Sequence, residues 1–243
     1  MNLETALEQC TIENNVVILP DVQLDRKVYA GLKKKLEGIG GKWNRKAKGF
    51  VFVDRDPNEL LGRVQKGEDI NLKKQYQFFP TPLSVAEIMR NHFPRIYNTV
   101  LEPSAGRGHL LKVVKNAADV DICELDYANV KYIYNSRNRE PILMCQDFMN
   151  YESDRKYDLV LANPPFTKGQ YCDHIKKMYS FLKDEDSRVV TIAPTGFQNA
   201  SVGKQKNFRE WLSTVDHEII SLPEGSFKES GTMVRTCIIV LRK

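Results

Sequence analysis

The stretch Tyr-Asp-Leu-Val-Leu-Ala-Asn-Pro-Pro-Phe at residues 157–166 constrains the fold most, because it joins a buried strand to a turn that cannot continue a sheet. Its first six residues form a short apolar run typical of a buried strand. The two prolines donate no backbone hydrogen bonds and stiffen the turn. Apolar residues at helical spacing follow over residues 170–182. A strand, a rigid turn and a helix place Asn163 at the carboxyl edge of a sheet, where open α/β sheets bind ligands.

An earlier stretch has the same form of a short strand followed by a polar turn. Residues 99–101 predict the strand, and Glu-Pro-Ser-Ala-Gly-Arg-Gly follows it. Gly106 and Gly108 permit a tight turn and close approach of the backbone to a ligand, before a helix that is expected to start near His109. The acid at Glu102 suits a cationic ligand and differs from a phosphate-binding loop.

Two further strands are predicted at residues 120–124 and 141–144, and each leads to an acid. Glu124 lies 22 positions after Glu102. That is close to the roughly 20-residue spacing at which a carboxylate binds the ribose hydroxyls of an adenosyl group. Asp126 is interpreted as a helix cap, and taken by itself Asp147 would be interpreted in the same way.

These motifs together resemble a known family. With the Phe-Phe-Pro-Thr-Pro entry into a helix at residues 78–82, they are similar to class I S-adenosylmethionine-dependent methyltransferases that act on planar amino nitrogens, chiefly the adenine-N6 DNA methyltransferases. Residues 223–241 resemble the tail of the methylation subunits of type I restriction-modification systems. The resemblance covers residues 76–243 with five motifs in the expected order, which is hard to obtain by chance.

The resemblance implies a Rossmann-like α/β fold for residues 76–243, with a mostly parallel seven-stranded sheet and an antiparallel final strand. Residues 188–193, 218–222 and 234–241 are its expected later strands. Phe78 is interpreted as a core aromatic, and Phe227 either as a core residue or as a border of the base pocket.

The resemblance also implies S-adenosylmethionine as the cofactor. Residues 79–81 would line its methionine end, Glu124 would bind the ribose, and Asp147 and Phe148 would contact the adenine. The full set of expected cofactor residues is Phe79, Pro80, Thr81, Glu102, Ser104, Ala105, Gly106, Gly108, Glu124, Leu125, Asp147, Phe148 and Asn163.

The chemistry expected at Asn163 suits the residues present. An exocyclic amine is a poor nucleophile, because its lone pair is delocalised into the ring. The Asn163 amide oxygen and the Pro164 carbonyl can accept hydrogen bonds from the amine and stabilise the positive charge that develops during attack. Phe166 would stack on an extruded base. The expected catalytic residues are therefore Asn163, Pro164, Pro165 and Phe166, and the alternative is an ordinary strand-ending turn with a packed phenylalanine.

Residues 1–70 are predicted to form a separate small α+β module. Its end overlaps a polar segment over residues 67–75 that is expected to be a linker. Within the module, residues 12–66 are interpreted as a β-α-β-β-α unit in which Asp25 and Asp56 cap the two helices. A basic hairpin spans residues 42–53. The expected core is built around Trp43, Phe50 and Phe52.

The charge of this module is uneven. Residues 26–48 contain nine basic residues and one acid, a local net charge of +8, whereas the whole chain carries +5. A basic helix and hairpin beside an aromatic suit nucleic-acid phosphates, although a solvated lysine-rich face is the alternative. The expected nucleic-acid-binding residues are Lys33, Lys34, Trp43, Arg45, Lys46, Lys48, Lys168 and Lys204.

Composition narrows the class of protein. Hydrophobic residues make up 42% of the 243 positions and charged residues 28%, which is typical of a globular protein. There is no apolar run of membrane-spanning length, and Glu4 and Glu8 stand where a signal peptide would be basic. The five scattered cysteines indicate reduced thiols in the cytoplasm. They form no disulfide frame and no metal site, and direct methyl transfer needs no metal.

The sequence therefore predicts an adenine-N6 DNA methyltransferase that flips its target base out of double-stranded DNA. Alternatives are methylation of guanine N2 in ribosomal RNA or of protein glutamine, and a non-catalytic accessory protein of a restriction or mobile-element system. Only 77 residues follow Phe166, too few for a separate target-recognition domain. Base readout is therefore expected from the N-terminal module, from the Lys168 turn, from a polar loop over residues 196–206, or from a specificity partner or second copy.

Overall fold

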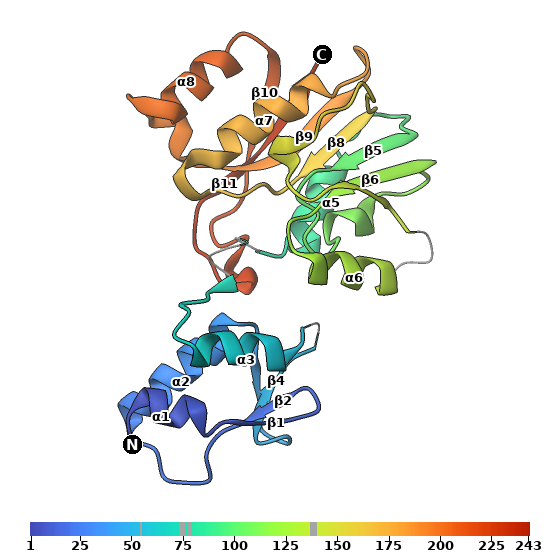
Figure 1. Ribbon diagram of the computed structural model, residues 1–243. Coiled ribbons are helices and arrows are strands. Elements are labelled where there is room, and N and C mark those ends of the chain that lie inside the picture. Colours follow the sequence, from blue (N-terminus) through green and yellow to red (C-terminus); the bar gives the residue numbers. More distant parts are fainter. Residues whose placement is uncertain (54, 73–75, 77–78, 137–139) are drawn as a thin grey trace. The chain divides into compact units, whose positions relative to one another are not determined.

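The computed structural model of the protein describes residues 1–53, 55–72, 76, 79–136 and 140–243. Phe78 and residues 73–75 of the expected linker lie outside the described residues. The chain divides into two compact units, Met1–Gln77 and Phe78–Lys243, called here the N-terminal and C-terminal units (Figure 1).

The N-terminal unit packs helices against an antiparallel sheet with the strand order β1-β2-β4-β3. Its strands are β1 (Thr11–Glu13), β2 (Val16–Ile18), β3 (Lys42–Asn44) and β4 (Gly49–Val51). Its helices include α1 (Leu3–Glu8), α2 (Arg26–Gly38) and α3 (Pro57–Gln65). The predicted caps are confirmed: Asp25 accepts from the Lys27 amide at 2.7 Å and Asp56 from the Asn58 amide at 2.8 Å.

Three expectations for this unit were wrong. Element α1 and strand β1 were missed, because six and three residues are too short to show a periodic pattern. The second hairpin strand ends at Val51, two residues early. Trp43 does not belong to the core. Phe50 and Phe52 are buried, but Trp43 lies on the edge strand β3 with 44% of its surface exposed, and its ring meets Phe50 edge-on at 5.3 Å.

The C-terminal unit has a seven-stranded sheet with the order β10-β11-β9-β8-β5-β6-β7, which confirms the predicted fold class. Strands β5 (Thr99–Glu102), β6 (Asp119–Cys123), β7 (Ile142–Cys145), β8 (Leu159–Ala162) and β9 (Arg188–Pro194) are parallel to one another. Strand β11 (Thr236–Arg242) runs antiparallel to both of its neighbours, β9 and β10 (Asp216–Ser221).

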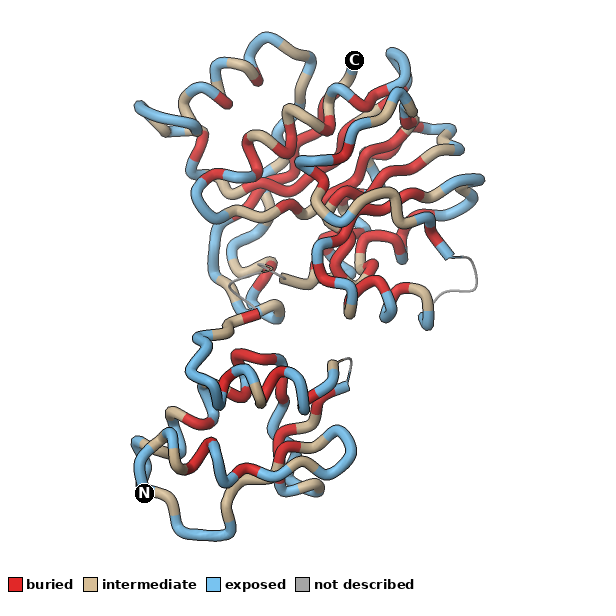
Figure 2. The backbone as a smooth tube through the Cα atoms, in the orientation of Figure 1, coloured by how far each residue is buried: buried red, intermediate tan, exposed pale blue. Residues whose placement is uncertain are grey.

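Helices cover both faces of this sheet, as Figure 1 shows. Helices α7 (Gln170–Ser180) and α8 (Gly203–Leu212) pack on one face, while α5 (Leu83–Arg90) and α6 (Tyr127–Ser136) pack on the other. In Figure 2 the buried residues concentrate in the strands between them. Phe227 is 2% exposed and packs in the core, as one of its two interpretations expected.

Strand β8 is apolar at every position because both faces of the sheet are covered there. Leu159 and Leu161 pack into the core layer under α5, whereas Val160 and Ala162 pack into the layer under α7. All four residues are fully buried, because a strand covered on both faces needs apolar side chains in both directions. The strand begins at Leu159, two residues later than predicted, and Tyr157 forms only an isolated bridge to Leu182.

Two local predictions for this unit were also wrong. The helix expected near His109 is only the 3₁₀ turn η1 (Leu110–Val113), because Val114 is extended and Asn116 is left-handed, which leaves no room for helical turns before β6. The polar loop expected over residues 196–206 is instead the 3₁₀ turn η4 (Thr195–Asn199) and the first turn of α8. Among the described residues, no helix is long and apolar enough to cross a membrane.

Candidate active site

The four polar residues expected at the strand ends lie along one edge of the sheet. Glu102 is the last residue of β5, while Glu124 and Asn163 directly follow β6 and β8, and Asp147 follows β7 by two positions. Because these strands are parallel, their carboxyl ends share an edge. The strand order places the residues along it in the sequence Asn163, Glu102, Glu124 and Asp147.

The glycine turn after β5 is held by Glu124. Gly106 and Gly108 have φ angles of 53° and 69°, a region that favours glycine, and a Cβ atom on Gly108 would lie 3.3 Å from Ile133 Cγ1. Glu124 Oε2 accepts from the Gly106 amide at 2.7 Å. Its Oε1 accepts from the Asp126 amide at 2.9 Å and from Asn129 Nδ2 at 3.1 Å. A carboxylate has about four acceptor positions, so Glu124 retains capacity for one further donor such as a ligand hydroxyl.

The edge concentrates buried carboxyl groups. Glu102, Glu124 and Asp126 are 1%, 8% and 4% exposed. Burial raises the pKa of the Glu124 carboxyl above its ordinary value, and its hydrogen bonds from Asp126, Asn129 and Gly106 oppose that shift. A cationic ligand at this edge would stabilise the ionised carboxylates, whereas a phosphate would be repelled.

Asp147 acts as a cap in the structure. Its Oδ1 accepts from the Met149 amide at 2.9 Å, which caps the 3₁₀ turn η2 (Phe148–Asn150), and its Oδ2 accepts from Asn150 Nδ2 at 3.2 Å. Phe148 is 2% exposed, with its ring 5.6 Å from the ring of His174. By contrast Leu125 is 52% exposed beside Glu124. Contact of Asp147 and Phe148 with an adenine, and of Leu125 with the cofactor, stays a prediction.

Buried His174 on α7 should make the protein sensitive to acid. Burial lowers the pKa of its imidazole from 6.5 to about 4; Asp147 and Asp173 raise the pKa, and Lys177 and Lys204 lower it further. Between pH 6.5 and about pH 4 the unfolded chain binds a proton at His174 that the folded chain does not. Neutral His174 therefore contributes its full share of the folding free energy above pH 6.5. This contribution, on the order of 3 kcal/mol in total, is lost as the pH falls toward about 4.

When the pH is lowered from about 7 to about 4.5, the free energy of unfolding should fall in the wild type by about 2 kcal/mol more than it falls in His174→Gln. Urea unfolding at the two pH values measures this difference. His174→Phe, a second substitution that does not titrate, should behave in the same way. Equal losses in all three proteins would show that His174 is not the group responsible.

Asn163 makes two contacts that sequence patterns did not predict. Its Nδ2 donates to the Phe79 carbonyl oxygen at 3.1 Å and to Thr81 Oγ1 at 3.2 Å. A carbonyl can only accept, so the nitrogen of the amide must face Phe79 and the amide oxygen must face away. Phe166 is half-buried, with its ring edge-on to Tyr171 at 6.1 Å.

Comparisons with known proteins find methyltransferases among the relatives of this chain. The type II methyltransferase M.CvrRI of Paramecium bursaria Chlorella virus XZ-6E is 30% identical over 93 residues, which are 36% of this chain. The type II methyltransferase M.AccI of Acinetobacter calcoaceticus is 24% identical over 209 residues, 72% of this chain. The chain spans 24% and 38% of the length of these two relatives. No family model matches the chain.

Solved structures decide the fold. One similar structure is a protein from Listeria monocytogenes that is assigned to the class I S-adenosylmethionine-dependent methyltransferases. It superposes with a TM-score of 0.57 at 14% identity, and the superposition covers 99% of this chain and 85% of the Listeria chain. A methyltransferase subunit of a type I restriction-modification system from Streptococcus thermophilus has a TM-score of 0.56 at 18% identity, over 76% of this chain and 49% of its own. The C-terminal unit has the class I methyltransferase fold. The resemblance to restriction-modification methyltransferases that the motifs indicated is likewise confirmed.

The basic residues expected to contact nucleic acid lie in different surroundings. In the C-terminal unit, Lys168 is exposed and has a left-handed φ of 53° just after the Asn-Pro-Pro-Phe turn. Lys204 is ion-paired with Asp173. In the N-terminal unit, Lys33 pairs with Glu37 at 3.8 Å. The other expected residues of that unit are exposed on α2 or on the β3–β4 hairpin: Lys34, Trp43, Arg45, Lys46 and Lys48.

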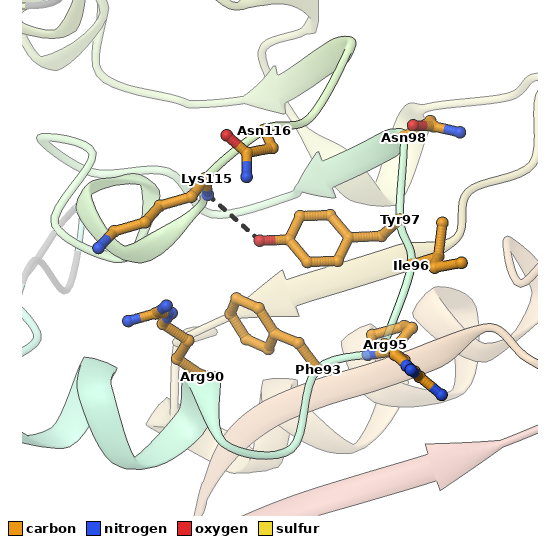
Figure 3. Close-up of a pocket in the computed structure, with 9 residues that line it drawn as sticks. Arg90, Phe93, Arg95, Ile96, Tyr97, Asn98, Lys115 and Asn116 are labelled. Atoms are coloured by element: carbon orange, nitrogen blue, oxygen red, sulfur yellow. Dashed lines mark hydrogen bonds between the residues drawn. The ribbon is translucent and has the colours of Figure 1, made fainter.

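A pocket of about 420 Å³ lies at the opposite, amino edge of the sheet (Figure 3). Its lining includes Asn98, directly before β5, and Lys115, which precedes β6. The charged ends of Arg90 and Lys115 lie on the same side of it in Figure 3, and Arg90 is ion-paired with Glu87 at 3.4 Å. This pocket contains none of the motif residues, so we place the candidate site at the carboxyl edge on the chemistry of its side chains.

Proposed function

We propose that the protein transfers a methyl group from S-adenosylmethionine to the N6 amino group of adenine in DNA. The observation that carries this proposal is the orientation of Asn163. Its amide nitrogen is bound to Phe79 and Thr81, so its oxygen is free to accept from a substrate at the edge where the buried acids gather.

The residues at this edge fit the cofactor. S-adenosylmethionine supplies a methyl group on a positively charged sulfur, together with an ammonium and two ribose hydroxyls. Glu102 provides buried negative charge toward those cations, and Glu124 has room for one hydroxyl donor. The turn at Gly108 packs so closely on α6 that a Cβ atom there would meet Ile133, which holds the turn beside these acids.

The catalytic turn would then activate the amine. Asn163 Oδ1 and the Pro164 carbonyl would accept the two amino hydrogens and so orient the amine. Methyl transfer would form the N–C bond as the S–C bond breaks and would develop positive charge on the nitrogen, which these two oxygens would stabilise. The nitrogen finally releases one proton to solvent. Phe166, whose ring is only partly buried, stacks on the extruded base.

Two observations support DNA as the substrate. The curated relatives are named type II methyltransferases, and a solved structure of similar fold belongs to a restriction-modification system. The N-terminal unit exposes a cluster of lysines and arginines with Trp43 among them, which suits the phosphates of double-stranded DNA. A specificity subunit or a second copy of the chain would supply any further base readout.

The decisive experiment offers the purified protein S-adenosylmethionine with a labelled methyl group. Unmethylated DNA, ribosomal RNA and a protein extract are tested in parallel, and the modified nucleoside or residue is identified by mass spectrometry. We expect N6-methyladenine in the DNA sample. Label in guanine N2 of the RNA, or in glutamine, would assign the same turn to a different planar amine, and no transfer to any sample would contradict an enzymatic role.

A further inference from the structure

Residues 79–82, called the strap below, lie against the catalytic turn and are bound to it by one side chain. Both hydrogen bonds come from Asn163 Nδ2, one to the Phe79 carbonyl oxygen at 3.1 Å and one to Thr81 Oγ1 at 3.2 Å. The two partners lie 84 and 82 positions earlier in the chain. Both hydrogens of the amide are therefore engaged, and they are engaged by the same short segment.

This arrangement fixes which way the amide points. A rotation that exchanged the nitrogen and oxygen of Asn163 would bring its oxygen against the Phe79 carbonyl oxygen, and neither atom carries a proton. The Thr81 hydroxyl can donate or accept, so the Phe79 carbonyl selects the orientation, and in that orientation Thr81 Oγ1 accepts from the amide nitrogen and holds it in place. The amide oxygen is consequently held on the side away from the Phe79 carbonyl.

The strap itself has little freedom to move. Pro80 and Pro82 fix their own φ angles, and a residue that precedes a proline is restricted to extended backbone, which applies to Phe79 and Thr81. The hydroxyl of Ser230 donates to the Pro80 carbonyl from the C-terminal segment. Thr81 is only 4% exposed. The two acceptors for Asn163 are thus in place before any ligand binds.

We infer that Thr81 is a positioning residue for Asn163. Its hydroxyl, together with the Phe79 carbonyl, holds the amide so that the oxygen faces the reacting amine. This inference rests on the proposed function and deepens it, because it gives the strap a role in catalysis in addition to the cofactor contact that sequence resemblance implied.

Kinetics of two variants test the inference. Thr81→Val keeps the shape but removes the acceptor, and Thr81→Ser keeps the acceptor. At saturating cofactor and DNA we expect the single-turnover rate to fall about tenfold in Thr81→Val and to stay within about twofold in Thr81→Ser. The Kd for S-adenosylmethionine should stay within about twofold in both. An unchanged rate at saturation with a Kd raised about tenfold would overturn the inference and assign Thr81 to cofactor binding.

A second measurement does not depend on methyl transfer. In ¹⁵N-labelled protein the Asn163 side-chain amide pair is assigned by its loss in Asn163→Asp. In Thr81→Val one of its two protons should shift and exchange faster with solvent, and in Thr81→Ser neither should. An unaltered pair in Thr81→Val would overturn the inference. The expected shift without methylation of any substrate would support the positioning contact and contradict the proposed function.

Discussion

Replacing Asn163 with alanine should lower the rate of methyl transfer to DNA by about 10²- to 10³-fold. The substitution removes the oxygen that we propose stabilises positive charge on the amine, and also the two hydrogen bonds to Phe79 and Thr81. The acids proposed to bind the cofactor are untouched, so the Kd for S-adenosylmethionine should stay within about threefold. Transfer of labelled methyl groups and isothermal titration calorimetry measure the two quantities on one preparation.

Two further variants sharpen this test. Asn163→Asp keeps an acceptor oxygen but has no amide hydrogens to bind the Phe79 carbonyl, so we expect a loss smaller than that of alanine. Asn98→Ala removes an exposed amide at the opposite edge of the sheet and should leave the rate unchanged. A rate for Asn163→Ala near that of the wild type would exclude its proposed role. Loss of cofactor binding together with the rate would show that the residue contacts the cofactor or supports the structure of the edge, and would contradict a role confined to the amine.

The basic cluster of the N-terminal unit should account for much of the affinity for DNA. We expect a variant with five exposed or half-exposed lysines changed to serine to raise the Kd for double-stranded DNA at least tenfold near physiological salt. The slope of log K against log salt should become shallower by about 3 to 4, since each phosphate contact contributes about 0.9 and Lys33 is already paired with Glu37. The five are Lys33, Lys34, Lys35, Lys46 and Lys48.

A control variant changes Lys115, Lys156 and Lys183 to serine at the amino edge of the other unit. It lowers the net charge as well, but leaves the N-terminal cluster intact. Fluorescence anisotropy at several salt concentrations should show a slope close to that of the wild type for this control. If the five-lysine variant binds DNA as the wild type does, the cluster is a solvated surface and the DNA contacts lie elsewhere.

Sequence patterns predicted the backbone of the site well. Apolar runs that end in Glu102 and Asn163 indicate parallel strands, and parallel strands necessarily bring their carboxyl ends to one edge. The structure confirms the seven-stranded sheet and its antiparallel last strand. The caps at Asp25 and Asp56 were also predictable, because capping depends on residues within one helical turn.

Side-chain contacts between distant residues were not predictable. Phe79 and Asn163 carry no shared pattern, and the bond between them follows from how α5 and β8 pack in the same unit. The burial of Trp43 was predicted incorrectly, because β3 has only three residues and an exposed edge, too few to define an inward face. Asp147 fits both a helix cap and a ligand residue, and only the structure shows its oxygens bonded to Met149 and Asn150.

The four buried residues of β8 have a consequence for the precision of the site. Since this strand contributes to the hydrophobic layers on both faces of the sheet, its amides should be among the slowest in the protein to exchange with deuterium. Asn163 is joined directly to that strand, so the position of its oxygen can vary little more than the strand itself. The exposed Lys168, five residues further on, lies outside the core layers, so its side chain is held less tightly than the Asn163 amide.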